Sequence, residues 1–336
     1  MDSEAGQSKE DFFFKEIFPL IKENHEKLGW PDVQPEDVKP TYLKALSNMT
    51  YQVTCKIPGV PTLLAKRFGQ GFLDKLLDRS IDNKVSKAIG DIGVGPKVLY
   101  FTEKCRLEEF LVCEEFTAAD MHDPRKRLLV AYELQKLHRT VIPELPKESL
   151  FDRCISNNIH IFQLYREALE EKKDKFSDKE KERLNLVNKL IDQKEIDWLS
   201  SHLKAYSDDL VVSHNDPLNG NILKLPSGEL KLIDFEYCTY NFRACDIAGF
   251  LLESLIDYTV DHDPYFRSQF ADRESIINPS NIVKYYLLFS AYPESPSYED
   301  AKELIDNPQA ADKELVRLFG SEKAWQNKVD MFSSEL

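Results

Sequence analysis

One segment, Val211–Glu253, constrains more than any other what this chain of 336 residues folds into. Within it, the apolar runs Ile222–Leu225 and Leu230–Ile233 flank the turn formers of Pro226–Gly228. Two short apolar runs joined by such a turn predict a β-hairpin. A further apolar run, Leu210–Val212, predicts a short strand that leads into a loop before the hairpin.

Polar residues with the chemistry of phosphoryl transfer surround this hairpin. His214 and Asp216 follow the first strand, Asn221 enters the hairpin and Asp234 leaves it. The two ends of a hairpin lie side by side, so we expect Asn221 and Asp234 to meet. In phosphoryl-transfer enzymes one carboxylate orients the attacking hydroxyl, while an Asn and a second carboxylate hold Mg²⁺ against the nucleotide phosphates. An isolated Asp or Asn is more often a turn former, but the whole constellation on one hairpin favours this chemistry.

Length and charge set further bounds. A chain of 336 residues exceeds one ordinary domain, so we expect two lobes. The net charge of −14 argues against a nucleic-acid or anionic-membrane surface, which needs a basic face. ATP binds through a few local cations and Mg²⁺, so the charge is compatible with it. An acidic surface also suits a small cationic substrate.

The cysteines and the absence of targeting signals predict a cytoplasmic protein. The six cysteines show no metal-binding spacing and fit a reducing cytosol better than a disulfide framework. The N-terminal region is acidic and lacks the pattern of a signal peptide. No apolar run approaches the ~18 residues of a membrane span.

Patterning along the chain predicts a strand-rich first part and a helical remainder, an α+β organisation. Residues 1–116 read as an N-terminal helix and a β-rich lobe, and residues 117–336 as a helical lobe carrying the hairpin. The predicted strands are Thr50–Ile57, Leu63–Phe68, Lys97–Phe101 and Glu108–Cys113. The predicted helices are 11–28 with a bend near Pro19, Leu73–Ile89, Arg125–His138, 157–173, Ser177 towards Leu199 after a capping box, and further helices from about 244 onward.

Two stretches, HNDPLNGNIL and LIDFEYCTYNFRACDI, resemble the choline/ethanolamine kinase family. The likeness extends through LHRTVIP, RLEEF, GVGPKVLY and LSNMTYQV, and so covers most of residues 41–332. Protein kinases have Gly after Asp-Phe, whereas this chain has Glu236, so the second stretch is specific. The resemblance implies a bilobal protein-kinase-like fold, with an N-terminal antiparallel sheet lobe, a hinge near residues 107–116 and a mainly helical C-terminal lobe.

The resemblance implies ATP- and Mg²⁺-dependent phosphorylation of the hydroxyl of choline or ethanolamine, for phospholipid synthesis. By position, Asp216 is the catalytic base, and Asn221 and Asp234 bind Mg²⁺. Glu236 helps to set the metal site or faces the substrate ammonium. His214 braces the loop.

The family resemblance also places a nucleotide site in the first lobe. Lys66 occupies the position of the cation for the α- and β-phosphates, and Asp82 that of the acid which pairs with it. Ser47 and Asn48 lie in the turn over the phosphates, although the glycines usual before this pair are replaced by Ala45-Leu46. The adenine hinge, Leu107–Leu111, includes Glu109 and Leu111.

The amine site is where the chain departs from the family. The family's last helix supplies aromatic residues that wall the ammonium, whereas this chain stops at Leu336, so it reads as shortened there. Cation–π contacts and carboxylates hold a quaternary ammonium. The remaining candidates for substrate contact are Glu236, Tyr240, Glu253, Asp257, Tyr258 and Tyr265. Arg243 and Asp246 also match the family, and for them a buried structural pair is favoured over contact with substrate.

Three interpretations follow from these residues. The leading one is an active choline or ethanolamine kinase, of a family that often forms homodimers. The second is a related kinase of the aminoglycoside-phosphotransferase type, acting on another hydroxylated amine. The third is a weakly active or inactive kinase-like binding subunit, favoured by the altered phosphate turn and opposed by the intact Asp216, Asn221 and Asp234.

Overall fold

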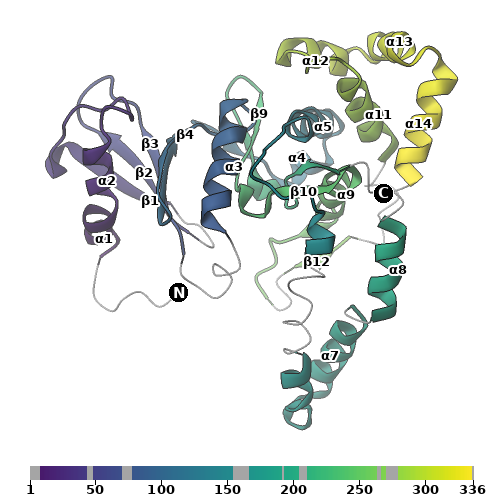
Figure 1. Ribbon diagram of the computed structural model, residues 1–336, viewed down its shortest axis with the longest axis horizontal. Coiled ribbons are helices and arrows are strands. Elements are labelled where there is room, and N and C mark those ends of the chain that lie inside the picture. The colour runs from purple at the N-terminus through teal and green to yellow at the C-terminus, as the bar shows by residue number, and fades with distance from the viewer. Residues whose placement is uncertain are drawn as a thin grey trace.

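An antiparallel sheet forms one end of the molecule and helices form the other (Figure 1). The computed structural model describes residues 8–43, 48–69, 78–153, 166–190, 193–203, 210–262, 266–269 and 279–334. The sheet has the strand order β1-β2-β3-β5-β4, and all neighbouring strands are antiparallel. Its strands are β1 (Val38–Leu43), β2 (Met49–Cys55), β3 (Leu63–Arg67), β4 (Val98–Phe101) and β5 (Cys105–Glu109).

Two short helices, α1 (Lys9–Glu16) and α2 (Phe18–Glu23), pack against this sheet. Phe13 is fully buried, and its ring centroid lies 5.3 Å from that of Tyr51 on β2. Pro19 lies in the first turn of α2, where its missing N–H costs no helical hydrogen bond. The predicted bend near Pro19 is confirmed as a break between two helices.

Helix α3 (Arg79–Asp91) lies between the five-stranded sheet and the motif-bearing hairpin (Figure 1). It begins where the side chain of Asp78 accepts hydrogen bonds from the amides of Ser80 and Ile81. The part of the predicted helix before residue 78 lies outside the described residues. The helix ends at Asp91, two residues beyond the predicted end at Ile89.

The motif-bearing segment forms two small sheets. β7 (Leu210–Ser213) pairs with β10 (Thr239–Phe242), and β8 (Ile222–Lys224) pairs with β9 (Leu230–Leu232). A two-residue strand, β6 (Glu114–Glu115), pairs with the other edge of β8. The predicted hairpin is therefore confirmed.

Helices build the remainder of the fold around one large apolar core. The central helix α5 (Pro124–His138) packs against α11 (Pro279–Ser290), and Tyr132 meets Phe289 edge to face. The other helices are α4 (Ala118–His122), α7 (Asp178–Leu190), α8 (Gln193–Leu203), α9 (Arg243–Glu253), α12 (Tyr298–Asp306), α13 (Pro308–Phe319) and α14 (Glu322–Ser334). No helix in the described ranges is long and apolar enough to cross a membrane.

The predicted strand Glu108–Cys113 is wrong in its second half. β5 ends at Glu109, whose partner on β3 is Leu63. The amide of Phe110 still donates to the carbonyl of Thr62 at 3.3 Å, but the next position on the neighbouring chain is Pro61, which has no N–H to donate. The ladder therefore stops, and the chain leaves the sheet in an irregular link before β6.

Two helical predictions are tested in part. The capping box at Ser177 is confirmed, since Ser177 and Glu180 exchange hydrogen bonds between side chain and backbone at the start of α7. The long predicted helix beyond it is divided between α7 and α8, with residues 191–192 outside the described part. Of the predicted helix at 157–173, residues 166–170 are helical and those before 166 lie outside the described part.

Candidate active site

The hairpin brings Asn221 and Asp234 to its open end. Ile222 pairs with Leu232 in the ladder, and the amide of Ile233 donates to the carbonyl of Asn221 at 3.0 Å. Asp234 then adopts the left-handed conformation, with φ 67° and ψ 61°. This conformation is strained for a residue with a Cβ, although Asp tolerates it better than most. It turns the chain out of the strand at one of the two predicted metal ligands.

Asn221 also holds Asp216. Its Nδ2 donates to both the carbonyl and Oδ2 of Asp216, each at 2.9 Å. With Nδ2 engaged, Oδ1 of Asn221 makes no hydrogen bond within the described residues and is available to a ligand. The structure thus joins the predicted base and both predicted metal ligands in one site.

A buried carboxylate, Asp246 on α9, shapes the loop that carries Asp216. It accepts hydrogen bonds from the amides of His214 and Asn215, both at 2.7 Å. These bonds hold Asn215 in a left-handed conformation, with φ 66°. The side chain of His214 bonds the carbonyl of Ile233 at 2.9 Å and so ties the loop to the hairpin. His214 is fully buried, which agrees with the bracing role predicted for it.

Arg243 and Asp246, expected as a buried pair, are linked through Tyr286 and His138; Asp246 is buried, whereas Arg243 is half-buried. His138 on α5 contacts Asp246 through Nε2 at 3.0 Å and the hydroxyl of Tyr286 through Nδ1 at 2.8 Å. Arg243 donates to the same hydroxyl at 2.8 Å. Burial works to raise the pKa of Asp246, but the hydrogen bond from His138 and the amide of Asn215 hold it below its usual value. The ionised carboxylate is therefore part of the loop architecture.

Three carboxylates crowd the open end of the hairpin. Burial raises the pKa of Asp216, and the charge of Asp234 adds to the rise against the opposing effects of His214 and Asn221. Burial likewise raises the pKa of Glu236, and Asp234 again adds to the rise. A cation would relieve this repulsion.

The donor set fits Mg²⁺ shared with a nucleotide. The described residues contain no group of three or more His, Cys, Asp and Glu side chains that would enclose a metal ion alone. Mg²⁺ is usually held by one or two carboxylates together with substrate phosphates and water. Oδ1 of Asn221 and the carboxylate of Asp234 meet that requirement.

The predicted partnership of Lys66 with Asp82 is wrong. Lys66 lies 3.8 Å from Glu108 on the neighbouring strand β5. Asp82 is occupied by two guanidinium groups, those of Arg106 at 2.9 Å and Arg79 at 3.0 Å. Arg106 reaches Asp82 from β5. Asp82 of α3 therefore pairs with arginines, and Lys66 pairs with Glu108 on the neighbouring strand.

The structure describes three of the other residues predicted to bind the nucleotide. Asn48 is buried, and its Oδ1 accepts from the amide of Gly69 at 3.4 Å, whereas Ser47 lies outside the described residues. Glu109 turns its carboxylate to the amide of Lys97 at 2.8 Å. The amide of Leu111, in the irregular link after β5, has no backbone partner among the described residues.

The predicted substrate residues separate into two groups. Tyr258 is 54% exposed, and its hydroxyl donates to Glu253 at 2.9 Å. The negative charge of Asp216 contributes to the raised pKa of Tyr258, about 12, after burial and the bond to Glu253. Tyr258 is therefore within electrostatic reach of Asp216, the predicted base, and holds Glu253 by its hydroxyl. Asp257 is engaged by Arg267 at 2.6 Å and by Thr259.

The prediction of Tyr240 as a substrate contact is wrong. Tyr240 is only 7% exposed and belongs to the main apolar core. It lies on β10 opposite Val212 of β7, where it packs inside. Tyr265 lies outside the described residues.

Several residues of the site were missed in the sequence. Tyr237 is 44% exposed, and its pKa is raised first by burial and then by the charges of Glu236, Asp216 and Asp234. It follows Glu236 directly, which is the available signal. The others are three charged residues of the first lobe, Arg79, Arg106 and Glu108, and His138, which contacts Asp246 behind the loop of His214. RLEEF and LHRTVIP contain three of these, but their partners are distant in sequence.

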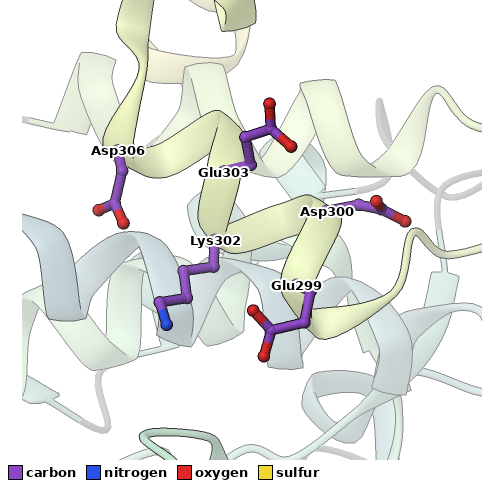
Figure 2. Close-up of a pocket in the computed structure, with 5 residues that line it drawn as sticks. All are labelled: Glu299, Asp300, Lys302, Glu303 and Asp306. Atoms are coloured by element: carbon purple, nitrogen blue, oxygen red, sulfur yellow. The ribbon is translucent and has the colours of Figure 1, made fainter.

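A separate surface pocket lies on α12 and contains none of the predicted site residues (Figure 2). It is lined by Glu299, Asp300, Lys302, Glu303 and Asp306. Asp306 is engaged by Arg125 through two hydrogen bonds, of 2.6 and 3.0 Å. All five lining residues come from this one short helix and four of them are acidic, so the pocket lacks the convergent groups of a binding site.

Sequence relatives extend the likeness over most of the chain. A family model described as choline/ethanolamine kinase matches residues 41–325. Choline kinase B1 of Caenorhabditis elegans is 29% identical over 299 residues, which are 85% of this chain and 73% of that protein. Choline kinase B2 of the same organism is 32% identical over 270 residues, covering 75% and 67%.

Solved structures show the same fold. A choline kinase from Cryptosporidium parvum superposes with a TM-score of 0.64 at 20% identity, over 96% of this chain and 94% of that one. An ethanolamine kinase from Plasmodium vivax gives 0.61 at 19% identity, over 91% and 85%. The fold is therefore protein-kinase-like, with an antiparallel N-terminal sheet and a mainly helical remainder. Together with the family match, these findings show that the chain belongs to the choline/ethanolamine kinase family.

Proposed function

We propose that this protein transfers the γ-phosphoryl group of ATP to the hydroxyl of choline or ethanolamine. The observation that carries the proposal is the joining of Asp216, Asn221 and Asp234 at one end of the hairpin. A base, an amide oxygen and a second carboxylate are the groups that this reaction needs. Family membership supplies the class of acceptor.

Asp216 is suited to orient the acceptor hydroxyl. Its Oδ2 is fixed by Asn221, so the carboxylate cannot rotate freely, and Oδ1 is left to accept a hydrogen bond from the substrate. As the hydroxyl oxygen forms its bond to the γ-phosphorus, the bond to the β-phosphate oxygen breaks and ADP leaves. The hydroxyl proton passes to Oδ1 of Asp216. Burial of this carboxylate makes it a stronger proton acceptor than an exposed Asp.

Asn221 and Asp234 would hold Mg²⁺, which offsets negative charge on the phosphate oxygens when it is bound. Lys66 is buried in the sheet, where its side chain is 11% exposed, and it supplies a cation from β3. The amide of Leu111, which has no backbone partner within the described ranges, is a donor for the adenine ring. These roles require a nucleotide between the sheet and the hairpin, with residues 1–116 and 117–336 as the two lobes.

The amine would lie against Tyr237, Tyr258 and Glu253. Both tyrosines are substantially exposed, and Glu253 adds a carboxylate bonded to the hydroxyl of Tyr258. An ammonium over an aromatic ring gains about 0.5–2 kcal/mol, and a neighbouring carboxylate adds attraction. Both a primary and a quaternary ammonium meet this requirement.

A binding role with little catalysis is the second candidate, and one observation favours it. Lys66 is engaged by Glu108, and Asp82 is occupied by two arginines, so the usual lysine–acid pair is absent among the described residues. A cation held by Glu108 can still face phosphate, and the intact hairpin site favours catalysis.

Turnover by the purified protein tests the proposal directly. The protein is mixed with ATP, Mg²⁺ and either choline or ethanolamine, and product is followed by ³¹P NMR. We expect a phosphomonoester signal with at least one of the two amines and its loss when EDTA is added. ATP binding without product from either amine, at enzyme concentrations near those of substrate, would support the binding role and contradict the proposal.

A further inference from the structure

Six charged side chains form an unbroken chain from the sheet to the catalytic hairpin. Lys66 of β3 lies 3.8 Å from Glu108, whose carboxylate is 2.5 Å from Nε of Arg106. Arg106 binds Asp82 of α3 at 2.9 Å. Arg79 completes the chain, because its NH1 lies 3.0 Å from Asp82 and 3.0 Å from Glu236.

The position of Arg79 within α3 is unfavourable for the helix itself. It is the first residue of α3, where the helix dipole favours anions and disfavours cations. Asp78 caps this end, so the helix does not need Arg79 to begin. The guanidinium lies over the ring of Phe68, 4.7 Å from its centroid, which places it between its two acids. The contacts outside the helix therefore explain this arginine.

The contact between Arg79 and Glu236 is buried on both sides. Their side chains are 11% and 9% exposed, so solvent screens the pair little. It joins residues 157 positions apart. Only one oxygen of Glu236, Oε2, is engaged, and the other has no hydrogen-bond partner among the described residues. Glu236 follows Asp234 by two residues, so fixing it also fixes the segment that carries the proposed metal ligand.

We propose that Arg79 is a positioning residue for phosphoryl transfer, which holds Glu236 and the end of the hairpin against α3. This inference rests on the proposed function. It assigns Glu236 to the phosphate side of the site, because an arginine shared between Asp82 and Glu236 would oppose an ammonium at the same carboxylate. Glu236 then affects the rate of the chemical step and leaves the binding of the amine unchanged.

Four variants and a control test this role: Arg79→Gln, Arg79→Lys, Glu236→Gln, the double variant Arg79→Gln/Glu236→Gln, and Lys87→Gln. Lys87 lies on the same helix in an exposed pair with Asp91, so its loss should leave kcat unchanged. We expect Arg79→Gln and Glu236→Gln each to lower kcat by about 10²-fold, as a small misplacement of reacting groups does. The double variant should be no slower than the slower single one, because both remove the same contact.

Two further readouts separate positioning from a purely structural tie. Arg79→Lys keeps a cation and should recover much of the rate lost in Arg79→Gln, whereas the KM for the amine should stay within about twofold in all variants. Melting temperatures with ADP and EDTA, and with ADP and Mg²⁺, give a readout besides activity. The increment caused by Mg²⁺ should be smaller in Arg79→Gln than in the control.

The outcomes are distinct from those that test the proposed function. A wild type without turnover contradicts that function, and this inference with it. If the wild type is active but the rate losses of the two single variants multiply in the double variant, this inference is overturned and the proposed function stands. The inference is overturned also if Arg79→Gln keeps the wild-type kcat, or if the KM for the amine rises and kcat does not fall. If Arg79→Gln fails to fold, Glu236→Gln carries the test: the inference is overturned if this variant keeps the wild-type kcat, or if its KM for the amine rises and its kcat does not fall.

Discussion

A buried carboxylate fixes the backbone immediately before Asp216, the proposed base. Asp246 accepts the amides of His214 and Asn215 at 2.7 Å, and His138 approaches the same oxygen as His214. Bonds to an ionised acceptor are stronger than those between neutral groups. They offset the cost of the left-handed Asn215, so the loop can turn immediately before the base.

Tyr258, the exposed tyrosine bonded to Glu253, should contribute to the binding of the amine. Tyr258→Ala should raise the KM for the amine by about 2- to 30-fold, the range expected for loss of a cation–π contact of 0.5–2 kcal/mol. Tyr258→Phe keeps the ring and should have a smaller effect. The KM for ATP serves as the internal control and should not change. Steady-state kinetics with each amine measure both constants, and an unchanged KM for the amine in Tyr258→Ala would exclude this ring from the amine site.

At the scale of secondary structure, the turn after α3 packs directly on the segment that follows Asp234. A Cβ added at Gly95 would lie 2.7 Å from Cε2 of Phe235 and 3.1 Å from the carbonyl of Leu232. Phe235 is 3% exposed and also packs on His214, with ring centroids 5.1 Å apart. The absence of a side chain at Gly95 is thus required for α3 to approach the hairpin.

Gly95→Ala should therefore destabilise the fold by about 1–3 kcal/mol, the usual cost of overpacking a buried contact. It should also lower activity, because Phe235 must shift. Gly249→Ala is the matched control. Gly249 lies within helix α9, and a Cβ added there would lie 3.6 Å from Pro217, an ordinary van der Waals contact. Urea unfolding followed by circular dichroism compares the two. Equal stability of both variants would show that this contact is not tight.

The buried acid of α3 predicts a dependence of stability on pH. Burial works to raise the pKa of Asp82, but Arg106 and Arg79 outweigh it and hold the pKa below the ordinary value of 3.8. Below that value the unfolded chain binds a proton that the folded chain does not, so folding is opposed. The stabilisation is therefore complete above the ordinary pKa and is lost as pH falls towards the lowered one.

Asp82→Asn should remove this contribution to the acid dependence. At neutral pH it should cost about 3–5 kcal/mol, because it leaves buried Arg106 with less compensation. Between about pH 4 and pH 3 the variant should lose less stability than the wild type. Asp91→Asn, in the exposed pair with Lys87, is the control and should follow the wild type. Parallel stability curves for wild type and Asp82→Asn would contradict the assignment.

Local patterns predicted the elements whose causes are local. The hairpin follows from Pro226–Gly228 between two apolar runs, and the start of α7 follows from Ser177 and Glu180. The end of β5 was not predicted, because it depends on Pro61 of the neighbouring strand. A strand's end is decided by its partner as much as by its own residues.

At the scale of the whole molecule, the site was predictable where one hairpin builds it. Asn221 and Asp234 meet through a ladder of nearby residues, whereas the partners of Lys66 and Asp82 are chosen among charges from β3, β5 and α3. The sequence does not indicate which acid an arginine on another strand will pair with, because that choice depends on tertiary packing. Tyr240 was misassigned for the same reason, since its place in the core depends on the pairing of β10 with β7.

The fold as a whole places the groups proposed to bind phosphate at the junction of sheet and helices. α3 lies between them (Figure 1), with Arg79 reaching the hairpin and Asp82 reaching β5 through Arg106. A nucleotide bound there would contact both parts, and ligand binding to the folded state raises stability. We therefore expect a change at Asp216 alone to separate catalysis from nucleotide binding.

The most direct test of the account compares wild type and Asp216→Asn for both properties. The Asn keeps the size of the side chain but cannot accept the hydroxyl proton as a carboxylate does. We predict that kcat with the preferred amine falls by about 10²–10⁴-fold, the usual contribution of a general base, while the Kd for ADP with Mg²⁺, measured by calorimetry, changes less than about threefold. An Asp216→Asn protein that phosphorylates the amine at the wild-type rate would contradict the central claim.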